Sequence, residues 1–240
     1  MVGLIVTTVK AIISFYQSSI GKKWIVALTG LVLVGFVTGH MIGNLQIFLG
    51  QEPLNKYAAF LQGLGELLWV IRGVMLACIG IHIVTTVLLT IQNAAATPQK
   101  YAVTKSQAAS IGAKTMAVSG TIILCFLIFH LLHFTTLSIH PEWQGWHDAE
   151  GRHDVYSLVI VGFQNPLASG FYLLGLFLLC MHLSHGIQSF IQTLGLRSRK
   201  IADTLTTASP YLAGLIFLGY ASIPVACFLG ILKPILTHAH

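Results

Sequence analysis

The chain has 240 residues, of which 55% are hydrophobic and only 8% are charged, against about 25% charged residues in a typical soluble domain. So few charges cannot cover a water-facing surface, and the mean hydropathy of +0.80 indicates that the lipid bilayer is the solvent. The net charge of +6 does not indicate nucleic-acid binding, because the basic residues lie mainly between the apolar segments.

The stretch before the first apolar segment is short and amphipathic. Residues 1–20 contain Lys10, and there is no clear small-residue cleavage site before Trp24, as a cleaved signal peptide would need. We expect these residues to form a helix that lies on the membrane surface.

Five apolar segments are long enough to cross a bilayer, which takes about 20 mostly apolar residues per helix. They cover about residues 24–49, 67–92, 116–138, 167–194 and 211–232. They lack the alternating pattern of roughly ten-residue strands that a membrane barrel needs. We therefore predict an all-α integral membrane bundle of five transmembrane helices, in a single domain over residues 1–240.

The basic residues divide unequally between the two ends of this bundle. Nine fall at one end: Lys10, Lys22, Lys23, Lys100, Lys105, Lys114, Arg197, Arg199 and Lys200. Four fall at the other: Lys56, Arg72, Arg152 and Lys233. Because cytoplasmic loops are enriched in Lys and Arg, we predict a multi-pass protein of the cell inner membrane, with its N-terminus in the cytoplasm and its C-terminus outside.

The longest predicted loop, about residues 139–166, falls on the outer side. Its aromatic residues, among them Trp143 and Trp146, suit the membrane interface. Pro166 is expected to open the fourth span.

Histidine recurs inside the spans, where ionisable side chains are costly and usually functional. The six are His40 in the first span, His82 in the second, His130 and His133 in the third, and His182 and His185 in the fourth. A single buried histidine is more often structural. At least one on each of four consecutive helices favours a shared function.

The depth of each histidine follows from the helical rise of about 1.5 Å per residue. His40 and His130 lie roughly 24 and 21 Å from the inner ends of helices that run outwards. His82 and His182 lie roughly 22 Å from the outer ends of helices that run inwards. The sequence therefore predicts an outer pair, His40 with His130, and an inner pair, His82 with His182.

Two imidazoles that face each other across a bundle are suitable axial ligands for a haem iron. Two stacked haems would form an electron path across the membrane. A zinc site needs three or four ligands at one depth, and a proton-relaying transporter usually adds intramembrane Asp or Glu. Depth alone does not choose between His130 and His133, or between His182 and His185.

Six short motifs in order strengthen this interpretation. They are SSIGKK at 18–23, ALTG at 27–30, GHMIGNLQ at 39–46, FHLLHF at 129–134, HLSHGIQS at 182–189 and QTLG at 192–195. Over nearly the whole chain, this series resembles the cytochrome b subunit of the di-haem, five-helix, single-anchor class of succinate:quinone oxidoreductases, the succinate dehydrogenases and fumarate reductases.

The resemblance implies two haem b groups, with an FAD-containing flavoprotein subunit and an iron–sulfur subunit bound at the cytoplasmic face. Electrons would pass between the iron–sulfur subunit and a membrane quinone, commonly menaquinone in this class. The chain would then be the quinone-reactive subunit of a respiratory-chain and tricarboxylic-acid-cycle enzyme, and the dicarboxylate chemistry would occur on the flavoprotein. The implied partners are these subunits, lipid and quinone, and no nucleic acid.

The resemblance also favours particular ligands to the haem iron. The first histidine of H-x-x-H-G matches the family ligand, which favours His182 over His185. It likewise favours His130 over His133. The second histidine of each couple is then an alternative ligand, or a partner for a haem propionate or a backbone carbonyl.

Three further positions bear on proton and propionate chemistry. Glu66, at the outer start of the second span, matches an acidic residue beside the family's quinone site, where a carboxylate can exchange protons with the quinone. It equally suits the positive N-terminus of a helix. Arg72 can pair with a propionate of the outer haem or extend to the interface. Cys180 stands where some relatives have a proton-conducting glutamate, so that pathway is not expected here.

Two other functions fit parts of the pattern. A di-haem anchor of another dehydrogenase, of the hydrogenase or formate dehydrogenase type, would share the haems but not the soluble partners. A non-redox transporter with buried histidines would bind no haem and would have no visible absorbance.

Overall fold

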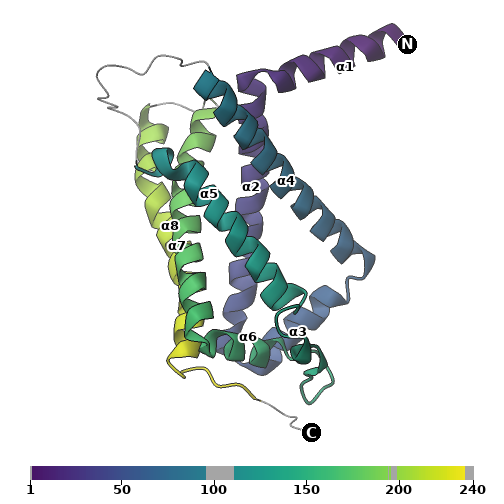
Figure 1. Ribbon diagram of the computed structural model, residues 1–240, viewed down its shortest axis with the longest axis vertical. Helices are drawn as coiled ribbons and strands as arrows, with labels where there is room; N and C mark the ends of the chain where they lie inside the picture. The colour runs from purple at the N-terminus through teal and green to yellow at the C-terminus, as the bar shows by residue number, and fades with distance from the viewer. Residues whose placement is uncertain (1, 96–110, 194, 196–198, 236–240) are drawn as a thin grey trace.

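The computed structural model describes residues 2–95, 111–193, 195 and 199–235. In this part of the chain, the helices are accompanied by one isolated β-bridge, between His147 and His153. Five helical segments are long and apolar enough to cross a membrane, and they run side by side in Figure 1. The predicted all-α, five-span architecture is confirmed, and the protein is a multi-pass membrane protein.

The first span is preceded by the separate N-terminal helix that the amphipathic pattern predicts. This helix, α1 (Val2–Gln17), projects at a steep angle from α2 (Ser19–Asn44) in Figure 1. Ser18 separates them, because its Oγ accepts a hydrogen bond from the amide of Gly21 at 2.9 Å and caps α2. The span continues as a 3-10 helix, η1 (Leu45–Leu49), and stops at Gly50, whose φ of 108° favours glycine.

The second and third spans are α4 (Glu66–Ala95) and α5 (Ile111–His130). Helix α4 packs against α2, and Thr85 is its only buried residue. Helix α5 packs against the fourth span and passes into a short π-helix, η2 (Leu131–Thr135). Such π-helical turns occur often at functional sites.

The fourth and fifth spans are α7 (Pro166–Thr193) and α8 (Arg199–Phe228), which pack against each other along the bundle. The predicted start at Pro166 is confirmed. The predicted start of the fifth span, at about residue 211, is wrong. The helix begins at Arg199, ahead of the apolar run, and it is joined to α7 at Ser209, whose Oγ accepts a hydrogen bond from the Gln188 amide at 2.7 Å.

Two helices at the C-terminal end of the bundle were not predicted. They are α3 (Gln51–Gln62) and α6 (Val155–Gln164), and α6 lies inside the segment that we expected to be a loop. Seven of the ten residues of α6 are buried. It therefore lacks the one-sided apolar stripe by which a surface helix is recognised in a sequence. A short 3-10 helix, η3 (Pro141–Gly145), precedes it.

A buried polar network holds α3 to the loop before α6. The Asn55 amide donates to Asp148 at 3.1 Å and to Asp154 at 3.0 Å, and Arg152 Nε donates to Asp148 at 2.9 Å. Burial disfavours the charge on Asp148, but the hydrogen bonds from Asn55 and Arg152 outweigh it and hold the pKa of this carboxyl below its ordinary value. The network therefore joins α3 to the segment that leads into α6.

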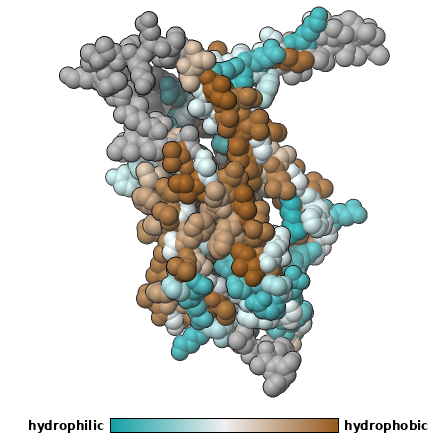
Figure 2. All heavy atoms as spheres, viewed as in Figure 1, coloured by the Kyte–Doolittle hydropathy of each residue, from teal (hydrophilic) through white to brown (hydrophobic). Residues whose placement is uncertain are grey.

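The surface of the bundle suits lipid. Figure 2 shows hydrophobic residues over the middle of the visible face, with hydrophilic residues gathered towards the ends. Large apolar side chains of α2, α4, α7 and α8 are exposed, as they are in a protein whose solvent is the bilayer.

Candidate functional site

The structure brings the predicted outer pair of histidines together. His40 lies four residues before the end of α2, and His130 is the last residue of α5. Their ring centroids are 5.8 Å apart, and the ring planes are inclined by 83°. Two imidazoles on opposite sides of one metal ion have centroids roughly 6 Å apart, because each metal–nitrogen bond is about 2 Å and each ring adds about 1 Å. The separation therefore suits two ligands of one ion.

Aromatic rings surround this outer pair. Phe36 stacks on His40 with centroids 5.4 Å apart, and Tyr220 lies 6.3 Å from the same ring. Phe126 and Phe134 each lie 6.2 Å from His130. These neighbours exclude water and offer flat apolar surfaces of the kind that a macrocycle contacts.

His133 has different neighbours from His130. Its side chain is 2% exposed, and its ring stacks on Phe134 with centroids 4.0 Å apart. Tyr172 connects the two histidines, because its hydroxyl lies 3.2 Å from His130 Nδ1 and 3.3 Å from His133 Nδ1. Of the two, His130 is the one that faces His40.

The inner histidines are held by hydroxyl groups. His82 Nδ1 lies 3.0 Å from Thr29 Oγ1, and Thr29 Oγ1 donates its proton to the carbonyl of Ile25 at 2.7 Å. A hydroxyl has one proton. While that proton is donated to the carbonyl, Thr29 accepts a hydrogen bond from His82, and in this tautomer Nε2 has the free lone pair.

The same arrangement recurs at His182 with a second hydroxyl. Ser119 Oγ lies 3.4 Å from His182 Nδ1 and donates to the carbonyl of Met116 at 3.1 Å. In the tautomer that donates from Nδ1, each inner ring has Nε2 available, which is the usual arrangement when the other ring nitrogen of a metal-binding histidine is hydrogen-bonded.

The positions of these two hydroxyl residues in the sequence give the distance between the inner and the outer histidines along the bundle. Thr29 precedes His40 by eleven residues, and Ser119 precedes His130 by eleven residues. Eleven residues are about three helical turns and about 16 Å of rise, so the members of each couple share one face of their helix. Two independent helices thus give the same separation between the levels.

Small residues let the inner rings approach the neighbouring helices. A Cβ atom at Gly30 would lie 3.4 Å from His82 Cε1, and one at Gly120 would lie 3.8 Å from His182 Cε1. These glycines therefore lie directly against the inner histidines, on α2 and α5.

The remaining predicted residues lie elsewhere. Glu66 is exposed in the first turn of α4. Arg72 is exposed and lies over the ring of Trp69, 4.9 Å from its centroid. His185 is partly buried one turn beyond His182 on α7.

The sequence prediction missed Thr29, Ser119 and Tyr172. A hydroxyl residue eleven positions before each outer histidine was a usable signal for the first two. Among the residues that the structure describes, no three or more His, Cys, Asp or Glu side chains gather in a group that could hold a metal ion.

Comparisons with protein-family models, with curated proteins and with solved structures found no match to this chain.

Proposed function

We propose that this chain is a di-haem cytochrome b that anchors a succinate:quinone oxidoreductase in the membrane. The observation that carries the proposal is the outer pair, in which the ring centroids of His40 and His130 are 5.8 Å apart. Below it, His82 and His182 contact Thr29 and Ser119, which lie about 16 Å of helical rise before the outer histidines. The order of the motifs around these histidines is the second support.

His40 and His130 would hold one haem b, and His82 and His182 the other. When bound, each haem would accept and release one electron at a time. Thr29 and Ser119 would orient the inner imidazoles with the Nε2 lone pairs free to hold the group.

The position of the chain in an electron path follows from the charge distribution. With nine of the thirteen Lys and Arg residues at the N-terminal end, this end would face the cytoplasm and bind the iron–sulfur and flavoprotein subunits. The outer pair would lie near a quinone, commonly menaquinone in the class that the chain resembles. Glu66 begins α4 at the same end of the bundle and would exchange protons with the quinone.

The test is the haem content of the purified chain, measured by the reduced-minus-oxidised spectrum and a pyridine haemochrome assay. We expect two haem b groups per chain. His40→Ala and His130→Ala should lose the same haem, and His82→Ala and His182→Ala should lose the other. His185→Ala is the matched control on α7 and should retain both.

Other outcomes would change the proposal in defined ways. A folded chain from haem-supplied cells without visible absorbance would refute the electron-transfer function and favour a transporter. One haem per chain would mean that one histidine pair is structural. Two haems with co-purification of a hydrogenase or formate dehydrogenase, and without a flavin-containing subunit, would reassign the partners.

A further inference from the structure

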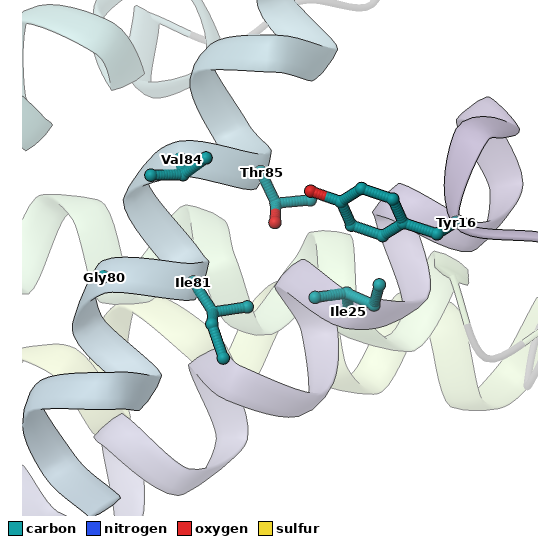
Figure 3. Close-up of a pocket in the computed structure, with 6 residues that line it drawn as sticks. All are labelled: Tyr16, Ile25, Gly80, Ile81, Val84 and Thr85. Carbon is teal, nitrogen blue, oxygen red and sulfur yellow. The ribbon is translucent and has the colours of Figure 1, made fainter. Parts of the chain in front are cut away.

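The two ends of the bundle differ in the chemistry that they offer to a ligand. At the N-terminal end, α1, α2 and α4 surround an open hollow with an almost wholly apolar lining (Figure 3): Tyr16, Ile25, Gly80, Ile81, Val84 and Thr85. At the other end, residues 136–154 lead from the third span to α6 and are polar. They include one arginine, Arg152, and no lysine, against four acidic residues: Glu142, Asp148, Glu150 and Asp154. The excess negative charge of this segment attracts cations.

The last part of this segment forms a short antiparallel hairpin in which two histidines are paired. His147 and His153 form the bridge between its two strands. On one side of the bridge the amide of Asp148 donates to the Arg152 carbonyl at 2.9 Å, and an equivalent bond of 3.0 Å lies on the other side. The histidines are therefore opposite each other in a pair that is not itself hydrogen-bonded. This is the kind of pair in which the two Cα atoms are closest, about 4.5 Å apart.

The side chain of Asp148 holds the turn of this hairpin. Its Oδ1 accepts from the amides of Glu150 and Arg152, each at 3.0 Å, and its Oδ2 accepts from Arg152 Nε at 2.9 Å. Side chains alternate between the two faces of a strand. Asp148 lies on the buried face, so His147 and His153 lie on the opposite face, where His147 is exposed. The hairpin is thus a fixed support that holds both imidazoles on its outer face.

The two imidazole rings are close enough to share one ion. Their centroids are 6.4 Å apart, and the ring planes are inclined by 73°. Two imidazoles bound to a tetrahedral ion have centroids about 5 Å apart, because each metal–nitrogen bond is about 2 Å and each ring adds about 1 Å. The two separations differ by about 1 Å, a shift that rotation of the exposed His147 side chain can supply.

Backbone carbonyls determine which nitrogen of each ring can bind the ion. Nδ1 of His147 lies 2.8 Å from the Gly145 carbonyl oxygen, and Nδ1 of His153 lies 3.1 Å from the Trp146 carbonyl oxygen. A carbonyl oxygen only accepts, so each Nδ1 has a proton and donates it, and the lone pair of the neutral ring is on Nε2. A carbonyl that accepts from the second ring nitrogen is usual for a metal-binding histidine.

We propose that His147 and His153 bind one divalent transition-metal ion, Zn²⁺ or Cu²⁺, through their Nε2 atoms. Imidazole suits these ions, whereas Ca²⁺ and Mg²⁺ prefer oxygen ligands. Water fills the remaining coordination positions, because no third His, Cys, Asp or Glu completes a metal-binding group in the described part of the chain. The site lies outside the spans and is independent of the proposed haems. In the proposed orientation it takes its metal from the outer aqueous phase.

The test is isothermal titration calorimetry of the full chain with ZnCl₂, in nanodiscs of zwitterionic phosphatidylcholine. His238→Gln and His240→Gln are present in every sample, so that these C-terminal histidines do not compete for the metal. We expect one Zn²⁺ per chain at this site. His147→Gln and His153→Gln should each weaken binding by about tenfold or more, because the second ring binds the ion intramolecularly. His140→Gln is the matched control in the same segment and should leave the affinity unchanged.

Electron paramagnetic resonance of the same chain with Cu²⁺ identifies the ligands without relying on a variant. We expect superhyperfine splitting from two nitrogens, reduced to one nitrogen in His153→Gln. A spectrum without nitrogen splitting would overturn the proposal, and so would a Zn²⁺ affinity that is equal in the background chain and in both variants. Loss of Zn²⁺ binding in excess CaCl₂ would also overturn it, because such binding would belong to carboxylates.

Discussion

The hydrogen bond between Thr29 and His82 gives the sharpest test of the inner site. Thr29→Val removes the hydroxyl that accepts from His82 Nδ1 at 3.0 Å and leaves a side chain of similar shape. A neutral hydrogen bond contributes about 0.5–1.5 kcal/mol net. At about 59 mV per 1.4 kcal/mol for a one-electron couple, the expected shift in midpoint potential is about 20–60 mV.

The direction of the shift follows from the role of the hydrogen bond. In the proposed function, donation from Nδ1 would raise the basicity of Nε2 and so favour oxidised iron. Its loss should therefore raise the potential of the proposed inner haem and leave that of the proposed outer haem unchanged. The assay is a redox titration that follows the visible absorbance of both haems.

Thr38→Val is the matched control, since Thr38 lies on the same helix and its hydroxyl donates only to the Val34 carbonyl, at 2.9 Å. It should titrate as the parent chain does. Equal curves for Thr29→Val and Thr38→Val, or a shift confined to the outer haem, would refute the assignment of Thr29 to the inner haem.

Three further predictions concern the outer level and its supports. Tyr172→Phe should shift the potential of the proposed outer haem and not that of the inner, because the lost hydroxyl lies between His130 and His133. The same redox titration measures it, and a shift in both potentials would argue for a general change in packing. Gly175→Ala would place a Cβ 2.5 Å from the Phe126 ring of α5 and should destabilise the bundle by about 1–3 kcal/mol, measured as a lower thermal midpoint. Gly170→Ala is the control on the same helix, because its Cβ would meet no atom within 4 Å, and it should leave the thermal midpoint unchanged. The charged form of Asp148 stabilises the fold fully above its ordinary pKa of about 4, and this contribution is lost as the pH falls through its lower native pKa. Asn55→Leu removes one of the hydrogen bonds that lower this pKa, so the acid transition in tryptophan fluorescence should move to higher pH; an unchanged transition would contradict the role of the network.

Apolar length was sufficient to predict the spans, and histidine depth was sufficient to predict that His40 and His130 lie close together. Five runs of about 20 apolar residues give five helices, because hydrogen bonding within the helix is the simplest way to satisfy the backbone in lipid. The rise per residue placed His40 opposite His130 in advance, and the structure finds these two rings 5.8 Å apart.

Other features depended on contacts that leave no periodic pattern. Helix α6 is buried on most sides, so its apolar residues do not form a stripe. The sequence does not show which of His130 and His133 approaches His40 on α2, because the two residues lie only about one turn apart along the third span. The roles of Thr29 and Ser119 require the direction of each hydroxyl proton, which a sequence does not show.

The directions of these protons separate electron transfer from proton relay at the inner level. A relaying histidine must gain a proton at one ring nitrogen and release one from the other. With Nδ1 of His82 protonated, its proton is donated to Thr29, and the proton of Thr29 is donated to the Ile25 carbonyl, which has no proton to pass on. With Nδ1 of His182 protonated, the chain through Ser119 ends at the Met116 carbonyl in the same way. In this tautomer each hydrogen-bond chain ends at a carbonyl, which hinders a relay and suits a permanent metal ligand.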